Sequence, residues 1–572
     1  MTESKRCEAC SDCVSDSGDA RVLFTKEMKK THTILFPTML PMHFKLLSRI
    51  FNDHGYRTVL LENGTHGDTQ KIIDAGLKYV HNDTCYPAAL VIGQFIDALD
   101  SGKYDVQKTA LMLFQTCGGC RASNYLPLLR KALKKAGYGH IPVISLNFAG
   151  IEKNPGFHIN LPMLHRAVYA LLYGDLLMTL VSQCLPYETE KGSTQALADR
   201  WVGRLTEELS HGIRYRQIKE NYRAMLRDFA ALPRRKEKRV LVGIVGEIFV
   251  KFSPLGNNDL EEYLISEGAE TTMGGLCDFL LYVLFNMETD HKLYGTSALI
   301  AAVARIGSKY FIKKQDDMIR AVKENGVFRA PARFEETRRS AEPYIGYGTK
   351  MGEGWLLPAE MAELIHSGVP NVVVVQPFGC LPNHIIGKGM MKPMKEKNPE
   401  ANIVAIDYDA GATKINQENR LKLMLAAARE HAEKNQSVEI RETAAEKELM
   451  KTLGVGRATV RSALSELEHD GRIYKRHGVG TFVSSNKWMP AFEPIISLTY
   501  SLERLGMEIR NVIISSGLEY PKGELAKNFP QDKKIGRLSR LRLAGGETVV
   551  HITGSGLGGR NQELALAAAE NT

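Results

Sequence analysis

Three cysteines that lie far apart in the sequence each follow an apolar run that predicts a strand. Cys85 lies in KYVHNDTCYPA, Cys120 in LMLFQTCGGCRASNY and Cys380 in NVVVVQPFGCLPNH. Because ligands gather at the carboxyl ends of the strands in open α/β sheets, thiolates in such strand-to-helix loops can converge on one site. Soft thiolates are the ligands of iron–sulfur clusters. Three of them would leave one iron of a [4Fe-4S] cluster open to a substrate oxygen, a water or a small thiol.

The spacing alone leaves a second interpretation open, in which these are three unrelated core thiols, because free cysteine is among the most buried residue types. Gly118, Gly119 and Gly379 would let the backbone approach a cluster and offer N–H groups to its sulfurs. Polar residues beside the three loops are candidates for substrate contacts: His81, Asn82, Ser123, Asn383, His384 and Lys388.

The elements that must position these loops are strands and helices in alternation. From Thr31 to about Arg429, β-rich runs alternate with helical patterns, which indicates parallel α/β sheets. Runs such as NVVVVQPF and ANIVAIDYD are apolar at nearly every position, as expected of strands covered by helices on both faces. The fold class that we predict is α/β, with two Rossmann-like parallel-sheet lobes and a helical insert between them.

Composition limits the remaining possibilities. The 572 residues suffice for several domains, and the net charge of +9 arises from 74 basic and 65 acidic residues that are interspersed, so no wholesale polyanion binder is implied. The longest apolar stretch, LHRAVYALLYGDLLMTLV from Leu164, contains His165, Arg166 and Asp175 and predicts a buried helix instead of a membrane span. The N-terminus does not resemble a signal peptide. We therefore expect a cytoplasmic protein without membrane association.

In that reducing compartment the nine cysteines are expected to be metal ligands or core thiols, not disulfides. Cys184 and Cys277 lie in apolar helical contexts and are expected in the core. Cys7, Cys10 and Cys13 have the C-x2-C-x2-C spacing of ferredoxin-type and zinc sites, but the fourth ligand is missing. A remnant or a weak metal site fits that pattern.

Motifs around the three cysteines resemble the 2-hydroxyacyl-CoA dehydratase superfamily, most closely the dehydratase-like module of CoA-substrate-specific enzyme activases. They are NDTCYPA, QTCGGCRASNY, GEIFVKFSPLGNNDLE, MGEGWLLPAEM, QPFGCLPNHIIGKGM and ANIVAIDYDAGATKINQENRLKLM, and they recur in this order over residues 22–429. The resemblance implies that Cys85, Cys120 and Cys380 hold a [4Fe-4S] cluster. Cys117 stands where the motif more often has glycine, as a spare thiol or an alternative ligand.

The same resemblance implies an activity and partners. An ATP-driven activase injects single electrons, and an acyl-CoA substrate then loses water through a ketyl radical. The actin-like ATPase half of an activase is not recognisable in this chain. The chain is therefore expected to need an external ATP-dependent activase as electron donor. Two related subunits often pair in this superfamily, which implies a dimer.

The segment AAEKELMKTLGVGRATVRSALSELEHDGRIYKRHGVGTFVSS predicts a winged helix-turn-helix. Apolar side chains from Val460 to Leu467 recur at i, i+3, i+4 and i+7 and give the second helix one apolar face. Between Lys451 and Lys487 there are seven basic and three acidic residues. The alternative is a small helical subdomain with a solvated basic face. The candidate DNA contacts are Arg457, Thr459, Arg461, Arg472, Lys475, Arg476 and His477.

This segment resembles the GntR family of bacterial regulators, and the sequence up to about residue 545 resembles the start of that family's effector-sensing domain. The chain departs from the family pattern in two ways: the first helix of the winged domain is not evident, and the sensing domain stops short. The Gly-rich end, GGETVVHITGSGLGGRNQELALAAAE, resembles the C-terminal segment of type-2 glycerate kinases, where Arg560 and Asn561 are the residues to watch. Three joined resemblances indicate a composite chain: a natural fusion, a degraded reading frame or an assembly artefact.

The sequence thus carries two functional hypotheses. The first is an iron–sulfur protein that accepts single electrons from an activase for acyl-CoA dehydration or reduction, a lyase or an electron-transfer component. The second is a GntR-like DNA-binding regulator fused to a redox or metabolite-sensing module. The domains that we predict are a Cys-containing leader (1–30), lobe I (31–194), a helical insert (195–237), lobe II (238–429), a charged linker (430–442), a winged helix-turn-helix (443–486), a partial α+β sensing domain (490–544) and a Gly-rich tail (545–572).

Overall fold

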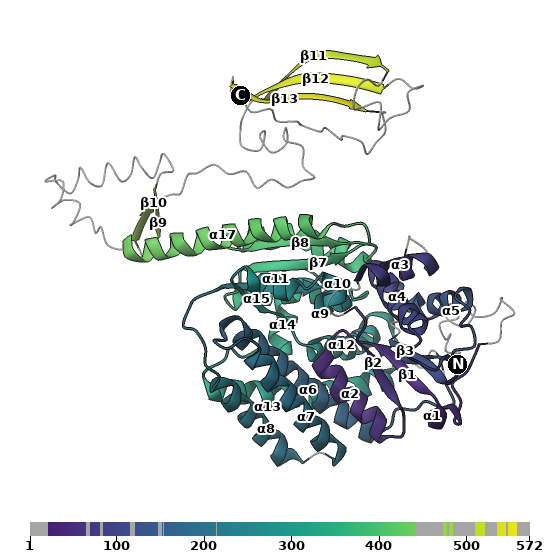
Figure 1. The fold of residues 1–572 in the computed structure, drawn as a ribbon. Helices are drawn as coiled ribbons and strands as arrows, with labels where there is room; N and C mark the ends of the chain where they lie inside the picture. Colours follow the sequence, from purple (N-terminus) through teal and green to yellow (C-terminus); the bar gives the residue numbers. More distant parts are fainter. Residues whose placement is uncertain are drawn as a thin grey trace. The chain divides into compact units, whose positions relative to one another are not determined.

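The structure is a computed structural model, and it divides into two compact units, Met1–Ser437 and Val438–Thr572. Each unit is described by itself (Figure 1). The residues that the structure describes are 21–64, 69–80, 84–114, 120–146, 152, 154–212, 214–441, 473–476, 480–483, 509–520, 535–544 and 547–556.

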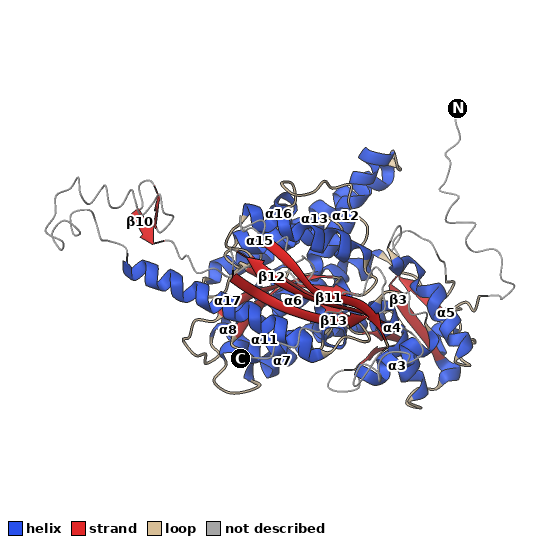
Figure 2. Cartoon of the chain, turned by 90° about the horizontal axis from the view of Figure 1, so that it is seen from above, coloured by secondary structure: helices blue, strands red, loops and turns tan. Residues whose placement is uncertain are grey.

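The first sheet of the larger unit is parallel, with the strand order β2-β1-β3-β4. Leu35 at its centre lies opposite Val59 on one side and Leu111 on the other. Helices α3, α4 and α5 lie beside this sheet (Figure 2). The elements are α1 (Met28–Thr31), β1 (Thr33–Pro37), α2 (Pro41–Asp53), β2 (Thr58–Leu61), α3 (Thr69–Tyr79), α4 (Tyr86–Asp100), η3 (Val106–Lys108), β3 (Thr109–Phe114), η4 (Arg121–Asn124), α5 (Tyr125–Lys135) and β4 (Val143–Leu146).

The second sheet is also parallel and has the equivalent order, β6-β5-β7-β8. Every residue of β7 is buried, as the apolar run VVVV requires. The prediction of an α/β fold with two parallel-sheet lobes is confirmed. The elements are β5 (Val240–Gly246), α9 (Ile248–Phe252), α10 (Pro254–Asn257), α11 (Leu260–Ser266), β6 (Ala269–Thr272), α15 (Leu356–His366), β7 (Asn371–Pro377), the π-helix η6 (Asn383–Gly387), α16 (Lys388–Lys397), β8 (Asn402–Tyr408) and α17 (Lys414–Arg441).

A third part of this unit is helical. It includes the expected charged helices α7 (Ser193–Ser210) and α8 (Tyr215–Ala230), and also α12 (Leu276–Tyr294), α13 (Ala298–Asn325) and α14 (Phe334–Ser340), which interrupt the second sheet region and were not predicted. At its centre is α6 (Leu161–Cys184), followed by η5 (Leu185–Tyr187). Within the described residues α6 is the one helix apolar and long enough to span a membrane, and 72% of its apolar stretch is buried. The prediction of a buried helix there is confirmed.

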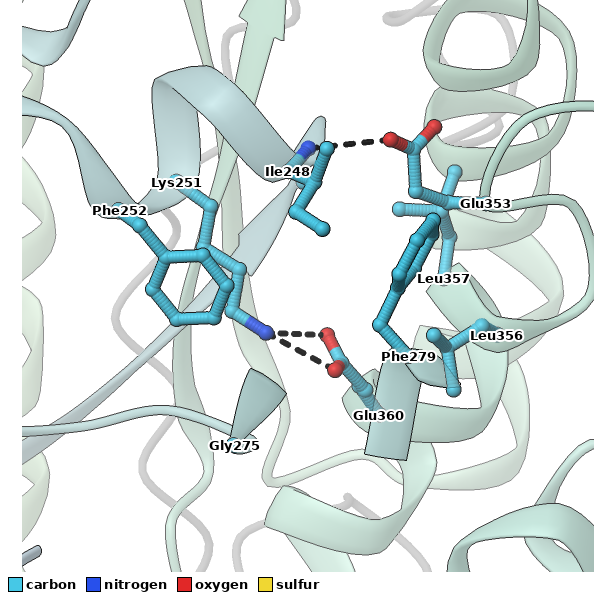
Figure 3. Close-up of a pocket in the computed structure, with 10 residues that line it drawn as sticks. Ile248, Lys251, Phe252, Gly275, Phe279, Glu353, Leu356, Leu357 and Glu360 are labelled. Atoms are coloured by element: carbon cyan, nitrogen blue, oxygen red, sulfur yellow. Dashed lines mark hydrogen bonds and ion pairs between the residues drawn. The ribbon is translucent and has the colours of Figure 1, made fainter. Parts of the chain in front are cut away.

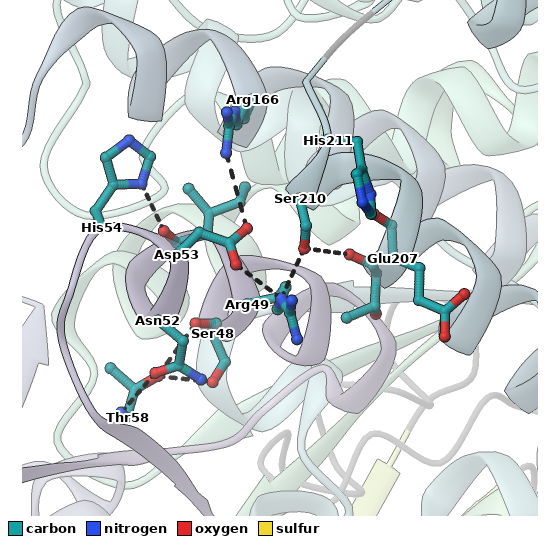
Figure 4. A network of polar contacts seen from close by, with 12 residues as sticks. Ser48, Arg49, Asn52, Asp53, His54, Thr58, Arg166, Glu207, Ser210 and His211 are labelled. Atoms are coloured by element: carbon teal, nitrogen blue, oxygen red, sulfur yellow. Dashed lines mark hydrogen bonds and ion pairs between the residues drawn. The ribbon is translucent and has the colours of Figure 1, made fainter.

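Polar contacts join the helical part to the first sheet region (Figure 4). Arg49 on α2 donates through Nε to Asp53 Oδ1 at 2.8 Å and to Ser210 Oγ at the end of α7 at 2.7 Å. Arg166 on α6 lies 3.7 Å from the other oxygen of Asp53. The Asp53 carboxylate therefore connects α2 to α6, and Arg49 connects α2 to α7.

The smaller unit contains two antiparallel sheets within the described residues. The hairpin β9 (Ile473–Arg476) and β10 (Gly480–Val483) places Tyr474 opposite Phe482, as the wing prediction requires. The second sheet has the order β11 (Ile509–Glu519), β12 (Ile535–Ala544), β13 (Glu547–Gly556). The two helices predicted for the helix-turn-helix lie outside the described residues.

Candidate functional site

The loops of Cys85 and Cys380 are in direct backbone contact. The Tyr86 N–H, at the start of α4, donates to the Phe378 carbonyl oxygen at 2.9 Å. Gly379 has a φ of +73°, and a Cβ there would lie 3.0 Å from the Cys85 Cα. Glycine is required at this position for both reasons, because a side chain is strained at positive φ and would press on the neighbouring loop.

Cys120 joins the same place through a third loop. A Cβ built on Gly352 would lie 2.7 Å from Pro382 Cγ, two residues beyond Cys380, and 3.8 Å from Cys120 Sγ. Arg121 also approaches, since its Nη1 would lie 3.1 Å from a Cβ on Gly379. The structure therefore brings together the loops of Cys85, Cys120 and Cys380.

One step of the sequence argument is wrong. Cys85 does not follow a strand, because the residues before it form α3, with Ile72, Ile73 and Gly76 buried on one helical face. Cys85 instead lies directly before α4. The position of α4 depends on glycine: a Cβ on Gly93 would lie 2.1 Å from the Ile72 carbonyl oxygen, so α3 and α4 pack closely.

The Cys120 loop follows β3, and Cys380 follows β7, as predicted. Both strands lie at the point where the order of their sheet reverses direction along the chain, where ligand sites of open α/β sheets are found. The loops therefore meet where the topology of the sheets favours a ligand-binding site.

Each of the three sulfur atoms has a hydrogen-bonding neighbour among the described residues. Cys85 Sγ lies 2.9 Å from the Tyr125 hydroxyl oxygen. The Ala122 N–H donates to Cys120 Sγ at 3.5 Å, and Asn383 Nδ2 donates to Cys380 Sγ at 3.3 Å. Three elements, α5, η4 and η6, supply these contacts.

Burial keeps the three thiols protonated when nothing is bound to them. It raises the pKa of Cys120 to about 11, and it raises the pKa of Cys85 and Cys380 as well. The carboxylates of Glu353 and Glu247 add to the effect on Cys380. Such thiols are poor nucleophiles. A bound metal, which deprotonates a coordinating thiol outright, would reverse this state.

Two buried glutamates act electrostatically on the thiols, and sequence reasoning missed both. Glu247 accepts a hydrogen bond from the Val250 N–H at 2.8 Å, and Glu353 accepts one from the Ile248 N–H at 3.0 Å. Burial and the neighbouring Glu353 raise the pKa of Glu247 to about 8. Near neutral pH Glu247 therefore keeps a proton in a site that holds three thiols.

A buried ion pair between Lys251 and Glu360 lines the same small pocket as Glu353 (Figure 3). Lys251 Nζ lies 2.9 Å from both carboxylate oxygens of Glu360, and the residues are 4% and 6% exposed. A small cavity is lined by both side chains and by Glu353. Gly274 passes over the pair so closely that a Cβ there would lie 2.7 Å from Glu360 Oε1.

The three thiols are the type of ligand that iron–sulfur clusters use. In the described part of the chain, no three His, Cys, Asp or Glu side chains are placed to hold one ion. The thiolates of a four-iron cluster bind different iron atoms and so need not meet at one point. Three thiols on converging loops, with a sulfur hydrogen bond each, match that requirement, and cluster binding by Cys85, Cys120 and Cys380 stays a prediction.

Of the other residues predicted to lie near the three cysteines, the structure describes some and not others. Asn383 and His384 begin η6, Lys388 begins α16, and Ser123 donates to the Cys120 carbonyl oxygen at 2.8 Å. Cys117, His81, Asn82 and the N-terminal Cys7, Cys10 and Cys13 lie outside the described residues. Cys184 and Cys277 are buried, as expected.

Several large apolar residues that lie next to the cysteine loops in the sequence have exposed side chains. Phe378 and Leu381 flank Cys380 and are 49% and 44% exposed, and Ile385 in η6 is 66% exposed. Phe114 at the end of β3 and Met351 beside Gly352 are 47% and 46% exposed. Large apolar groups in loops beside a polar buried site favour contact with an apolar ligand or a partner surface.

Two family models match the smaller unit. The model described as bacterial regulatory proteins, gntR family, matches residues 439–483, and the MOFRL family model matches residues 540–572. The resemblances to a GntR helix-turn-helix region and to a short glycerate-kinase segment are confirmed. All seven candidate DNA contacts fall inside the first match. Lys475 and Arg476 lie on β9, and the other five, like Arg560 and Asn561, lie outside the described residues.

Curated relatives agree with these matches. The chain is 35% identical over 101 residues to the HTH-type transcriptional repressor NagR of Bacillus subtilis, which is 17% of this chain and 42% of NagR. It is 80% identical over 27 residues to the D-glycerate 2-kinase of Thermotoga maritima, which is 5% of this chain and 6% of the kinase. The chain therefore spans less than half the length of either relative.

Among solved structures, PhnF from Mycobacterium smegmatis is 24% identical, with 22% of this chain and 57% of PhnF covered and a TM-score of 0.12. The possible transcriptional regulator YydK from Bacillus subtilis is 23% identical, with 22% and 56% covered and a TM-score of 0.10.

Proposed function

We propose that this chain is a GntR-type DNA-binding regulator joined to a redox-sensing unit. The match of residues 439–483 to the GntR family carries the DNA-binding part, with the 35% identity to the repressor NagR as further support. The described wing hairpin β9–β10 lies inside that match and carries Lys475 and Arg476. Basic residues on a wing contact the phosphate backbone. The setting that we propose is the cytoplasm, where a bacterial regulator meets DNA.

The redox-sensing part rests on residues 1–437. Cys85, Cys120 and Cys380 would hold a [4Fe-4S] cluster, which supplies one-electron redox chemistry when it is bound. The protein's own residues hold the thiolates on three glycine-packed loops and donate hydrogen bonds to the sulfurs. Glu247 retains a proton beside them because its pKa is about 8. The three converging loops are the observation that favours this role.

DNA binding is tested by fluorescence anisotropy of the full chain with a labelled duplex that the protein itself selects from a random library. We expect binding that weakens steeply with salt and that falls on Arg457→Ala. Arg216→Ala is the matched control, because Arg216 is an exposed arginine of the other unit that pairs with Glu220. Salt-insensitive binding, or equal losses in both variants, would contradict the proposal.

A second candidate function is supported by the cysteine site itself. The chain would be an iron–sulfur component that accepts electrons from an ATP-dependent activase for acyl-CoA dehydration or reduction. The exposed Phe114, Met351, Phe378, Leu381 and Ile385 favour it, because an acyl chain needs apolar contacts beside the reacting centre. Activase-dependent consumption of a 2-hydroxyacyl-CoA, lost on Cys380→Ala, would support this candidate. An inactive chain that still binds DNA would leave only the regulator.

A further inference from the structure

The hydrogen bonds to the three sulfurs come from different kinds of donor. The Ala122 contact is a backbone N–H, which among the natural residues only proline would remove. The Tyr125 and Asn383 contacts are side-chain groups, and both residues are buried, with exposed fractions of 9% and 0%. The two side-chain contacts can therefore be deleted one at a time, while the backbone N–H of Asn383, which also acts on Cys380, stays in place.

The direction of the Tyr125 contact follows from the state of Cys85. As a free thiol, Cys85 can give or take the proton, but a metal-bound thiolate has none to give. The Tyr125 hydroxyl lies 2.9 Å from Cys85 Sγ, and beside a thiolate it is the only group of this pair that carries a hydrogen. Tyr125 must then donate. The Asn383 amide nitrogen has no acceptor capacity and donates in every state.

These donors act against a negative surrounding. As a carboxylate, Glu353 opposes ionisation of Cys120 and Cys380, and Glu247 adds to this only above its pKa of about 8. A donor hydrogen offsets part of the negative charge on a sulfur, and the offset is worth more when an added electron makes the centre more negative. Hydrogen bonds to the sulfurs are one of the features that set the potential of an iron–sulfur centre.

We propose that Tyr125 and Asn383 are positioning residues that raise the reduction potential of the centre held by Cys85, Cys120 and Cys380. The inference rests on the proposed function, in that these cysteines must bind a cluster. Reduction adds one electron from an external one-electron donor to the centre, and no bond between protein atoms forms or breaks. The two hydroxyl and amide hydrogens stay on Tyr125 and Asn383 throughout.

The test is a potentiometric titration of the full chain after anaerobic reconstitution with iron and sulfide. Tyr125→Phe keeps the ring and deletes the hydroxyl, and Asn383→Leu keeps a similar shape and deletes the donor. Each should lower the reduction equilibrium constant about tenfold, which is 59 mV for a one-electron couple. The two donors serve different sulfurs, so the double variant should show about a hundredfold change.

Tyr86→Phe is the matched control. Tyr86 is buried beside Cys85, and among the described contacts its hydroxyl bonds to none of the three sulfurs. Its potential should equal that of the wild type. Unchanged potentials in Tyr125→Phe and Asn383→Leu, with iron content retained, would overturn the inference. So would an equal shift in Tyr86→Phe.

Iron content separates this inference from the proposed function. A wild-type chain that binds no iron overturns both, whereas iron binding with unshifted variants overturns the inference alone. If one variant loses its cluster, the reduction potential of the other variant decides the test. The wild type gives a further test that needs no substitution: the reduced centre should show magnetic couplings to protons that exchange in D2O, and their absence would overturn the inference.

Discussion

Replacing Lys251 with methionine should destabilise the larger unit by about 3–5 kcal/mol, the cost of leaving one partner of a buried ion pair uncompensated. Lys251 and Glu360 are nearly inaccessible, and both oxygens of Glu360 lie 2.9 Å from the lysine nitrogen. Methionine keeps the length of the side chain but removes the ammonium group, whose nitrogen lies 4.9 Å from the centroid of the Phe252 ring. The predicted loss therefore comes from charge and not from an empty space.

Neighbouring carboxyl groups increase the effect. Burial raises the pKa of Asp278 to about 7 and also raises that of Glu353, and the Lys251 charge opposes both shifts. Without the lysine, Glu360 loses its ion-pair partner while it stays buried near other acids. The double variant Lys251→Met/Glu360→Gln removes both charges and should recover most of the lost stability, because neutral replacements of a buried pair are often well tolerated.

The assay is urea unfolding of the full chain, followed by tryptophan fluorescence. Trp355 is fully buried, donates to Asn286 at 3.0 Å and directly precedes α15, the helix that carries Glu360. It therefore reports on the region around the pair. The reasoning is refuted if Lys251→Met unfolds within about 1 kcal/mol of the wild type, or if the double variant is as unstable as the single one.

Three further predictions concern Glu247, the two glycines Gly379 and Gly368, and the continuity of the chain at residues 437 and 545. Glu247 has a raised pKa, so the stability that its neutral form contributes is present at low pH and is lost as the pH rises from the pKa of the unfolded state toward about 8. Glu247→Gln should therefore make unfolding by urea less dependent on pH in that window. An unchanged pH profile would contradict this prediction. Gly379→Ala should lower the free energy of unfolding by about 1–2 kcal/mol because of the positive φ, and by a further amount because the new methyl group presses on Cys85; it should also reduce iron binding. Gly368→Ala, at φ +89° in open space, should lose only the part that comes from the positive φ and should keep the iron. Single sequencing reads across residues 437 and 545 should be continuous in the source genome, and a break there would show that the chain is not one natural gene product.

The sequence predicts much of this architecture because its signals are local. The run VVVV before Cys380 indicates a strand covered on both faces, and β7 is such a strand. The charged helices α7 and α8 and the buried α6 follow from periodicity and composition. Convergence of the cysteine loops was predicted from the rule that sites form at strand ends, and it holds for Cys120 and Cys380.

What could not be predicted depends on contacts between distant segments. The strand expected before Cys85 is helical, because a short apolar run does not distinguish a strand from the end of a helix. Glu247, Lys251, Glu353 and Glu360 lie inside motifs quoted from the sequence, but nothing local shows that they meet. Charged residues within otherwise apolar motifs were the available signal, since such residues are buried only when paired or protonated.

The most direct test of the cysteine centre is iron and sulfide analysis of the full chain purified without oxygen. The prediction is about four iron atoms per chain, lost on replacing Cys85, Cys120 or Cys380 with alanine and kept in Cys184→Ala, a buried thiol that lies elsewhere in the core. A wild-type chain without iron, or an equal loss in Cys184→Ala, would contradict the account.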